Sequence, residues 1–256
     1  GDVAEEARRF LRLPQVELVR PTNPMPARTA MGSPDAAQRL IAMAQPIRGT
    51  PVETYLAGRG IAPVDDAGAL RYHPRCYYRP DDGGPAERRP AMIARVTDLQ
   101  GRITGAHRTW LAPDGSGKAA VTTPRRAMGN LLGHAVRFGV AEYVLAVGEG
   151  IETMLSLRAA LPGMPMAAAL SAGHLGALEI PRSLRRLYIA RDADPAGDKA
   201  AAALTVRAVA EGIAVRVLSP RGGDFNDDLQ ATGLEDLRAA LRPQLDPQDA
   251  GRIREG

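Results

Sequence analysis

Two carboxylates that lie one residue apart, Asp192 and Asp194, follow an apolar segment in the stretch YIARDADPAG at 188–197. Side chains at positions i and i+2 of an extended segment point to the same side, so these negative charges converge on one small volume. The arrangement is costly unless a cation lies between the charges. Mg²⁺ prefers oxygen ligands and binds one or two carboxylates, while water and substrate phosphate complete its shell. The spacing therefore predicts a divalent metal site suited to phosphoryl chemistry.

Two further acids are set beside glycines, Glu149 in VLAVGEGIET and Asp224 in VRVLSPRGGDFNDDL. The glycines let the backbone turn sharply and leave room for a bulky anion. Any one of these acids could instead form a turn or cap a helix, and Asp194 could cap the helix that follows Pro195. Because three acidic clusters end three strand patterns, we interpret them as a metal site.

The elements that must position these acids begin near residue 143, where strand and helix patterns alternate. Strands are predicted at 143–147, 166–170, 187–190 and 214–218, and helices at 152–161, 174–180, 196–212 and 226–241. This alternation is typical of an α/β fold with a parallel sheet flanked by helices, in which ligands bind at the carboxyl ends of the strands. We therefore expect the separate acidic stretches to meet at one edge of the sheet.

The middle of the chain has a basic, β-rich pattern. The stretch AMIARVTDLQGRITGAHRTWL at 91–111 predicts a hairpin that turns at DLQGR, followed by the loop APDGSGKAAVTTPRR. Residues 67–140 contain 12 Lys and Arg against five acids, whereas residues 141–256 contain 13 against 16. A basic region next to an acidic one indicates polyanion binding beside metal-assisted chemistry. General arginine richness is the alternative, because 31 of the 33 basic residues are Arg.

The first 66 residues are predicted to be mostly helical. Helix patterns occur at 4–13, 35–45 and 50–60, where Thr50 is the expected N-cap, and a proline-rich linker is predicted at 20–34. We divide the chain into a helical segment with this linker at 1–66, a basic α+β subdomain at 67–140, a parallel α/β domain at 141–242 and a loose tail at 243–256.

The composition is that of an ordinary globular protein, with 45% hydrophobic and 24% charged residues. One cysteine, Cys76, excludes an internal disulfide and a multi-cysteine zinc site. The sequence contains no run of about 18 apolar residues and no signal-peptide pattern, so we expect a cytoplasmic protein without membrane contact.

Three patterns in the basic region are not interpreted as sites. The stretch GSGKAAVTT at 115–123 is not a P-loop, because Ala112 occupies the position of the first glycine. His73 and Cys76 have metal-like spacing but no second pair of ligands. Trp110 could stack on a base, although a lone Trp at a strand end is more often part of the core.

The motifs VLAVGEGIET, LYIARDADPAGDKAA and GGDFNDDL resemble, in order and spacing, the acidic motifs of the Toprim domain of bacterial-type primases, topoisomerases and certain nucleases. The upstream stretches ETYLAGRGI, VTDLQGRITGAHRTWL and GKAAVTTPRRAMG resemble the basic half of the RNA polymerase domain of bacterial and phage primases. The resemblance covers roughly residues 50–241. It implies a Toprim parallel sheet flanked by helices and preceded by a basic α+β subdomain, without the zinc-binding module of the bacterial family.

Carried over by position, Glu149 matches the first glutamate of the family, and its role as a proton acceptor or a metal ligand stays open. Asp192 and Asp194 match the metal-binding pair, and Asp224 matches a later metal-site acid. The resemblance thus implies the catalytic residues Glu149, Asp192 and Asp194. It implies a Mg²⁺ or Mn²⁺ site formed by Glu149, Asp192, Asp194, Asp224 and Asn226.

Asn226 stands where primases often have a second Asp. This departure would weaken one of two metal sites, although Asp227 and Asp228 lie close enough in the sequence to substitute for it.

Basic residues of the middle region are expected to bind the triphosphate and the template backbone. They are Arg95, Arg102, His107, Arg108, Lys118, Arg125 and Arg126. For any single Arg, a solvated surface charge is an equally good interpretation. Lys118 stands out because the chain has only one other lysine, Lys199, which we expect to face solvent on its helix.

The resemblance implies a DNA primase-type nucleotidyltransferase of DNA replication that makes short primers by two-metal phosphoryl transfer. Its partners would be a single-stranded DNA template and ribonucleoside triphosphates, with a replicative helicase or a zinc-binding module acting in trans. The main alternative is a Toprim metal-dependent nuclease. A third is a non-catalytic nucleic-acid-binding accessory protein of a mobile element. A topoisomerase is disfavoured, because 256 residues leave little room for a strand-passage arch.

Overall fold

Two short helices begin the part of the chain that the computed structural model describes, which comprises residues 33–64, 66 and 68–252. Helix α2 spans Pro34–Ala42, and the Ser33 side chain accepts a hydrogen bond from the backbone N–H of Ala36. Helix α3 spans Pro51–Ala57, and Thr50 accepts from the N–H of Val52, which confirms the predicted N-cap. The helix predicted at 4–13 and most of the linker predicted at 20–34 lie outside the described residues.

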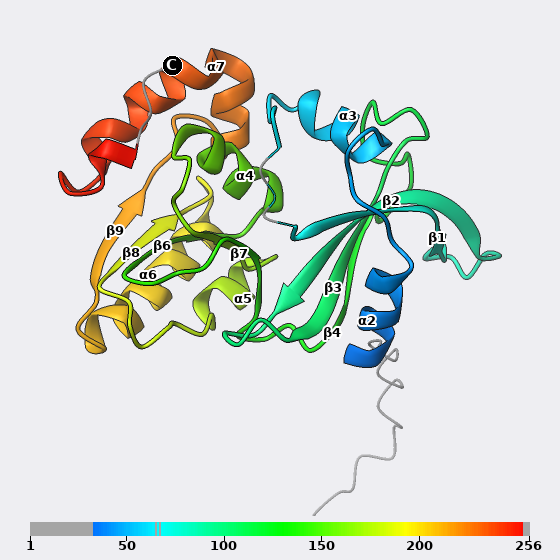
Figure 1. Ribbon diagram of the computed structural model, residues 1–256, viewed down its shortest axis with the longest axis horizontal. Helices are drawn as coiled ribbons and strands as arrows, with labels where there is room; N and C mark the ends of the chain where they lie inside the picture. Colours follow the sequence, from blue (N-terminus) through cyan, green and yellow to red (C-terminus); the bar gives the residue numbers. More distant parts are fainter. Residues whose placement is uncertain (1–32, 65, 67, 253–256) are drawn as a thin grey trace, which may run out of the picture. The chain divides into compact units, whose positions relative to one another are not determined.

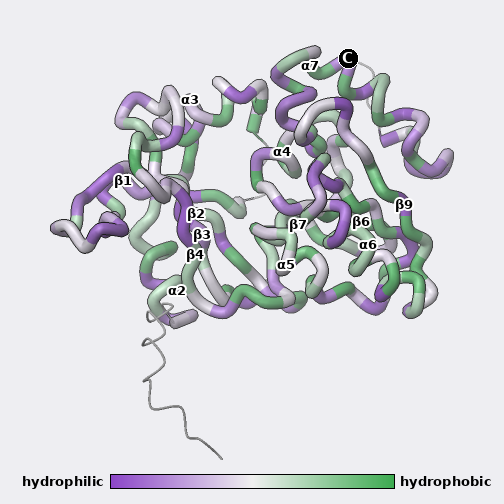
Figure 2. The backbone as a smooth tube through the Cα atoms, turned by 180° about the vertical axis from the view of Figure 1, so that it is seen from behind, coloured by the Kyte–Doolittle hydropathy of each residue, from purple (hydrophilic) through white to green (hydrophobic). Residues whose placement is uncertain are grey.

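An antiparallel layer follows, formed by β1 (Leu70–Tyr78), β2 (Glu87–Thr97), β3 (Ile103–Trp110) and β4 (Arg125–Gly129). The predicted hairpin is confirmed, because β2 pairs with β3 across the turn at 98–102. Strands β1 and β2 also form a hairpin, whose hydrophilic tip projects from the sheet in Figures 1 and 2. This layer is held to the rest of the sheet by β5 (Ala135–Phe138), which pairs antiparallel with both β2 and β7.

The parallel layer contains β6 (Val144–Gly148), β7 (Met166–Ala168), β8 (Arg186–Ala190) and β9 (Ala214–Leu218) in the order β7-β6-β8-β9. Its helices are α4 (Ile151–Ala160), α5 (Ala172–Gly176), α6 (Pro195–Ala210) and α7 (Phe225–Leu241). The predicted α/β fold with a parallel sheet flanked by helices is thus confirmed. One helix differs: α5 ends at Gly176, whereas the prediction placed a helix at 174–180.

Helices cover both faces of this sheet, as Figure 1 shows. Helices α3, α4 and α7 share one core with alternate strand residues such as Ala146 and Tyr188. The intervening strand residues, such as Leu145 and Ile189, pack against α5 and α6. Helix α2 packs on β3 and β4, and its Ala37 and Ile41 belong to a third core cluster. In the described residues one continuous nine-stranded sheet results, and the division at residues 66 and 140 stays a prediction.

The end of the chain is attached to the parallel layer. Two short 3-10 helices, η1 (Arg242–Gln244) and η2 (Ala250–Arg252), follow α7. Asp249 is buried, forms an ion pair with Arg186 and accepts a hydrogen bond from the Tyr188 hydroxyl at 2.8 Å. The prediction of a loose tail from residue 243 is therefore corrected for residues 243–252, because the ion pair of the buried Asp249 with the partly exposed Arg186 attaches them to β8. Residues 253–256 lie outside the described residues.

None of the helices described in this structure is long and apolar enough to cross a membrane.

Candidate active site

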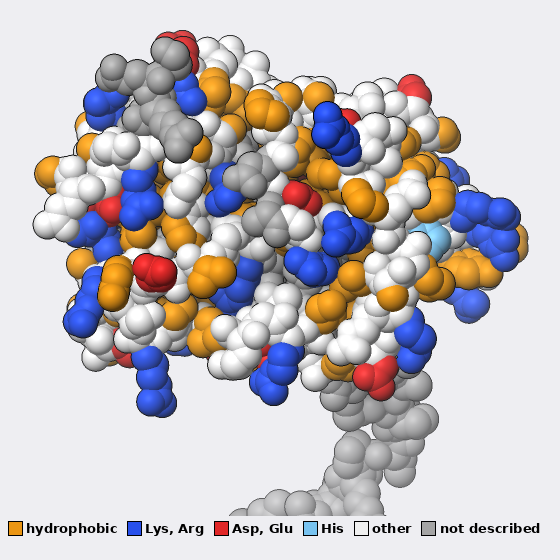
Figure 3. All heavy atoms as spheres, viewed as in Figure 1, with side chains coloured by type: hydrophobic (Ala, Val, Ile, Leu, Met, Phe, Trp, Pro, Cys, Tyr) orange, Lys and Arg blue, Asp and Glu red, His pale blue; other side chains and the backbone are white. Residues whose placement is uncertain are grey.

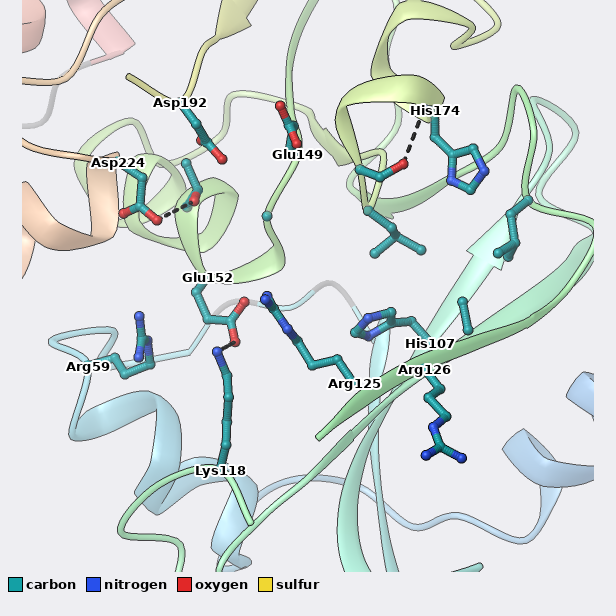
Figure 4. Close-up of a pocket in the computed structure, with 16 residues that line it drawn as sticks. Arg59, His107, Lys118, Arg125, Arg126, Glu149, Glu152, His174, Asp192 and Asp224 are labelled. Carbon is teal, nitrogen blue, oxygen red and sulfur yellow. Dashed lines mark hydrogen bonds and ion pairs between the residues drawn. The ribbon is translucent and has the colours of Figure 1, made fainter. Parts of the chain in front are cut away.

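Acids from three strand ends line one cavity of about 600 Å³ (Figure 4). Glu149 directly follows β6, Asp192 follows β8, and Asp224 lies between β9 and α7. These three strands are adjacent and parallel, so their carboxyl ends lie at the same edge of the sheet, as the sequence predicts. We call Glu149, Asp192 and Asp224 the acid wall of the cavity.

One carboxylate oxygen of Asp192 lacks a hydrogen bond within the part of the chain that the structure describes. Its Oδ1 is buried and accepts no hydrogen bond from any described residue. A buried polar atom of this kind is costly unless it binds something, so the atom fits a cation ligand. The turn after Asp192 is tight: a Cβ on Gly197 would collide with the backbone oxygen of Asp192, so glycine is needed there.

The acid wall is electrostatically unfavourable when no cation is bound. Burial, followed by the carboxylates of Glu149 and Asp224, raises the pKa of Asp192 to about 7. Burial and Asp194 also raise the pKa of Glu149, although a backbone hydrogen bond with Ala172 opposes the shift. Carboxylates that lie this close together favour either a proton or a metal ion. The wall therefore has the electrostatic character of a divalent cation site.

Asp224 combines capping with a position on this wall. Its Oδ1 accepts the backbone N–H groups of Asn226 and Asp227 at 2.7 and 2.9 Å, which caps α7. Its Oδ2 accepts the Thr153 hydroxyl at 3.3 Å. Among the described residues, no three His, Cys, Asp or Glu side chains are grouped as a ready metal site. Mg²⁺ usually binds only one or two carboxylates, so Asp192 with one neighbour would suffice.

Two of the predicted metal ligands have other contacts. Asp194 is exposed and caps α6, accepting the N–H of Gly197 at 2.7 Å, although its charge still raises the pKa of Asp192. The buried Asn226 amide donates to the Arg59 carbonyl and the Ser156 hydroxyl, each at 2.9 Å. Neither side chain lines the cavity. The structure therefore gives Asn226 a role in joining α7 to α4 and not a position on the acid wall.

Cations line the opposite side of the cavity (Figure 4). Lys118 comes from the loop between β3 and β4, Arg125 begins β4, and Arg59 follows α3. We call these three residues the basic wall. His107 on β3 lies beside them, and burial lowers its pKa to about 4, so its ring is neutral at pH 7. Figure 3, viewed as in Figure 1, shows Lys and Arg side chains close to acidic ones near the middle of the molecular surface.

Four predicted phosphate-binding residues do not present their charge to this cavity. Arg95 and Arg108 alternate along their strands with residues of the cavity side, so they point to the opposite face. Arg126 contributes to the cavity lining, but its guanidinium donates to Asp81 at 2.6 Å and points away in Figure 4. Arg102 is bonded to Asp98 at 2.7 Å in the β2–β3 turn. Of the seven predicted basic residues, the structure places His107, Lys118 and Arg125 opposite the acids.

Comparisons with known protein families agree with this geometry. Residues 144–235, which contain the whole acid wall, match the family model of the Toprim domain. This part of the chain is therefore similar to Toprim domains. The preceding residues 31–138 match the model of a domain of unknown function (DUF7146). No curated protein matches the chain.

Solved structures extend the likeness upstream of the Toprim domain. The chain is similar to the zinc-binding and RNA polymerase domains of the Aquifex aeolicus primase, with a TM-score of 0.56 and 17% identity. That match covers 83% of this chain and 60% of the Aquifex chain. A DNA primase domain from Pseudomonas aeruginosa gives a TM-score of 0.55 and 18% identity, covering 82% of this chain and 78% of that one. The resemblance to primase RNA polymerase domains is thus confirmed as a likeness of fold.

The sequence did not predict one buried carboxylate that lies near the acid wall. Glu152, in the first turn of α4, lines the cavity and is 7% exposed. Its Oε1 accepts a hydrogen bond from the Tyr55 hydroxyl at 2.6 Å. Arg59 and His174 also line the cavity without having been predicted. Glu152 lies within the motif VLAVGEGIET, so the sequence shows that an acid is present there. The sequence does not show that its side chain points into the cavity.

The raised pKa of Asp192 predicts how metal-free stability depends on pH. The folded state holds this proton more tightly than the unfolded chain, so stability falls as pH rises from about 4 through about 7. Asp192→Asn should therefore be more stable than wild type at pH 8, by about 2 kcal/mol after discounting for solvent screening, with the difference vanishing near pH 4. Thermal unfolding in EDTA at a series of pH values measures this difference. Parallel curves for the two proteins would refute this electrostatic account of the acid wall.

Proposed function

We propose that this chain is a primase-like nucleotidyltransferase that makes short primers on single-stranded DNA. The observation that carries the proposal is one cavity with the acid wall on one side and the basic wall on the other. The Asp192 oxygen that has no partner among the described residues supports cation binding, and the primase-like fold favours nucleotidyl transfer to a 3′-hydroxyl over phosphodiester cleavage. A triphosphate with its metal ions has the charge pattern that such a cavity would accommodate.

The acid wall would bind Mg²⁺ or Mn²⁺, with Asp192 and Asp224 as the ligands and Glu149 as a third ligand or as the proton acceptor. When bound, divalent cations lower the pKa of the attacking 3′-hydroxyl and neutralise charge on the leaving oxygen. Because its pKa is raised, Glu149 is suited to take the proton from the 3′-hydroxyl oxygen. Asp194 adds negative charge from the N-terminus of α6.

The basic wall would bind the phosphates of the incoming ribonucleotide. Lys118 and Arg125 come from the loop and strand that face the acid wall, so they can contact oxygens that the acids repel. The neutral ring of His107 can donate one hydrogen bond and accept another without adding charge. Arg59 extends the wall from α3. These residues would position the α-phosphate for attack and exclude water from the reacting atoms.

Template contacts would use arginines outside this cavity. The Arg102 side chain is 76% exposed, and contacts to the DNA backbone from such groups weaken as salt rises and carry little sequence preference. The Aquifex structure includes a zinc-binding domain, and we propose that a separate zinc-binding module or a replicative helicase assists this chain in trans. The cytoplasmic location and an origin in a mobile element stay predictions.

To test the proposal, the chain is incubated with single-stranded DNA, ribonucleotides and Mg²⁺ or Mn²⁺, with and without a zinc-binding module. New short oligonucleotides that depend on ribonucleotides are the expected result. Cleavage of the DNA when no nucleotides are present would replace the proposal with a nuclease. DNA binding without synthesis or cleavage, unchanged in Glu149→Gln, would replace it with an accessory binding protein.

A further inference from the structure

One carboxylate of the cavity lies among the cations instead of on the acid wall. Glu152 projects from the first turn of α4 toward the basic wall (Figure 4). Its Oε1 is 3.8 Å from the Lys118 Nζ, too far for a hydrogen bond, whereas the Tyr55 hydroxyl donates to it at 2.6 Å. The carboxylate is therefore fixed by the tyrosine, and its ion pair with Lys118 is longer and lacks a hydrogen bond.

The charge of Glu152 is retained despite its burial. Although burial alone would raise its pKa, Lys118 and the hydrogen bond from Tyr55 hold the pKa of Glu152 below its usual range. The Arg59 guanidinium lies 5.8 Å from the centre of the Tyr55 ring, so the cations and the tyrosine form one cluster around this carboxylate. Without Glu152, the three cations of the basic wall would face one another with no negative charge among them.

We propose that Glu152 is a built-in counter-anion of the basic wall, which lowers the affinity of the cavity for polyphosphate and thereby speeds the release of pyrophosphate. An incoming phosphate meets cations whose charge the Glu152 carboxylate already partly neutralises. Lys118 must therefore exchange its interaction with Glu152 for one with the phosphate, and the net gain in binding is smaller than for a free cation. The position of Glu152 among the cations is sufficient for the inference that it partly neutralises the basic wall. The identity of the polyphosphate, a nucleotide or its pyrophosphate product, rests on the proposed function.

The expected effect is a gain in affinity when the negative charge is removed. A unit charge several ångströms from a bound phosphate, in a partly screened site, changes affinity by about 3- to 10-fold. Glu152→Gln keeps the size of the side chain and its acceptor for the Tyr55 hydroxyl. We therefore expect this variant to bind inorganic tripolyphosphate about 3- to 10-fold more tightly than wild type.

The chain offers a matched control. Asp249 is also buried, accepts a tyrosine hydroxyl, from Tyr188, and pairs with a cation, Arg186, but it does not line the cavity. Asp249→Asn removes a comparable buried charge and should leave tripolyphosphate affinity unchanged. Isothermal titration calorimetry on the full chain with excess Mg²⁺ measures both variants, and thermal unfolding checks that each is folded.

Unchanged or weaker binding by folded Glu152→Gln would overturn the inference, and so would an absence of tripolyphosphate binding by wild type. If Glu152→Gln does not fold, Tyr55→Phe decides. This variant frees the carboxylate to draw Lys118 closer, so binding should weaken by about 2-fold. Equal or tighter binding would refute the proposal. None of these measurements needs primer synthesis, so failure of the proposed function would be seen separately.

Discussion

Asp192→Asn is expected to lower primer synthesis by about 10³-fold, because it removes the charge of the carboxylate whose Oδ1 has no hydrogen-bond partner in the described part of the chain. The amide keeps the shape of the side chain but cannot supply a negative ligand to a divalent cation. The measurement is the rate of oligonucleotide formation from ribonucleotides on single-stranded DNA with saturating Mg²⁺.

The matched control for this variant is Asp236→Asn, which neutralises an exposed acid on α7 and should retain wild-type activity. The folded state of both variants is checked by thermal unfolding in EDTA, where Asp192→Asn should be at least as stable as wild type. Primer synthesis by Asp192→Asn within a few-fold of wild type would show that this carboxylate is not part of the reacting centre.

Lys118→Ala is expected to lower kcat/KM for ribonucleotides by about 10- to 100-fold, since one charge-assisted contact to a phosphate contributes about 1.5–3 kcal/mol. Lys118 is partly buried on the basic wall, and burial lowers its pKa while Glu152 opposes that shift. Steady-state kinetics over a range of ribonucleotide concentrations measure the effect.

The chain has one other lysine, Lys199, which is exposed on α6 and serves as the control. Lys199→Ala should leave kcat/KM unchanged. An equal loss in both variants would mean that general positive charge, and not a contact in the cavity, is responsible.

The acid wall could be predicted from the sequence because the position of each acid depends on the residues next to it in the chain. Each acid directly follows an apolar strand pattern or precedes a helix pattern, and parallel strands place such positions at one edge. The caps at Thr50 and Asp194 could be predicted for the same reason, since capping depends on neighbouring residues. Asp194 also shows what neighbouring residues cannot decide, because its position fits both a helix cap and a metal ligand. In the structure its side chain caps α6.

Contacts between distant segments could not be read from the sequence. Tyr55 on α3 and Glu152 on α4 are 97 residues apart, and only the tertiary fold brings the two side chains together. Strand alternation implies that His107 and Arg108 face opposite sides, but which side faces the acids depends on where α2 packs. Asn226 was placed by analogy with a metal ligand, whereas its amide joins three segments of the core.

The central claim is that the acid wall binds a divalent cation, and anomalous scattering from crystals grown with Mn²⁺ tests it most directly. The account predicts an anomalous peak in contact with the Asp192 carboxylate and at least one of Glu149 and Asp224. Absence of a peak there, with Asp192 bonded instead to an arginine, would contradict it.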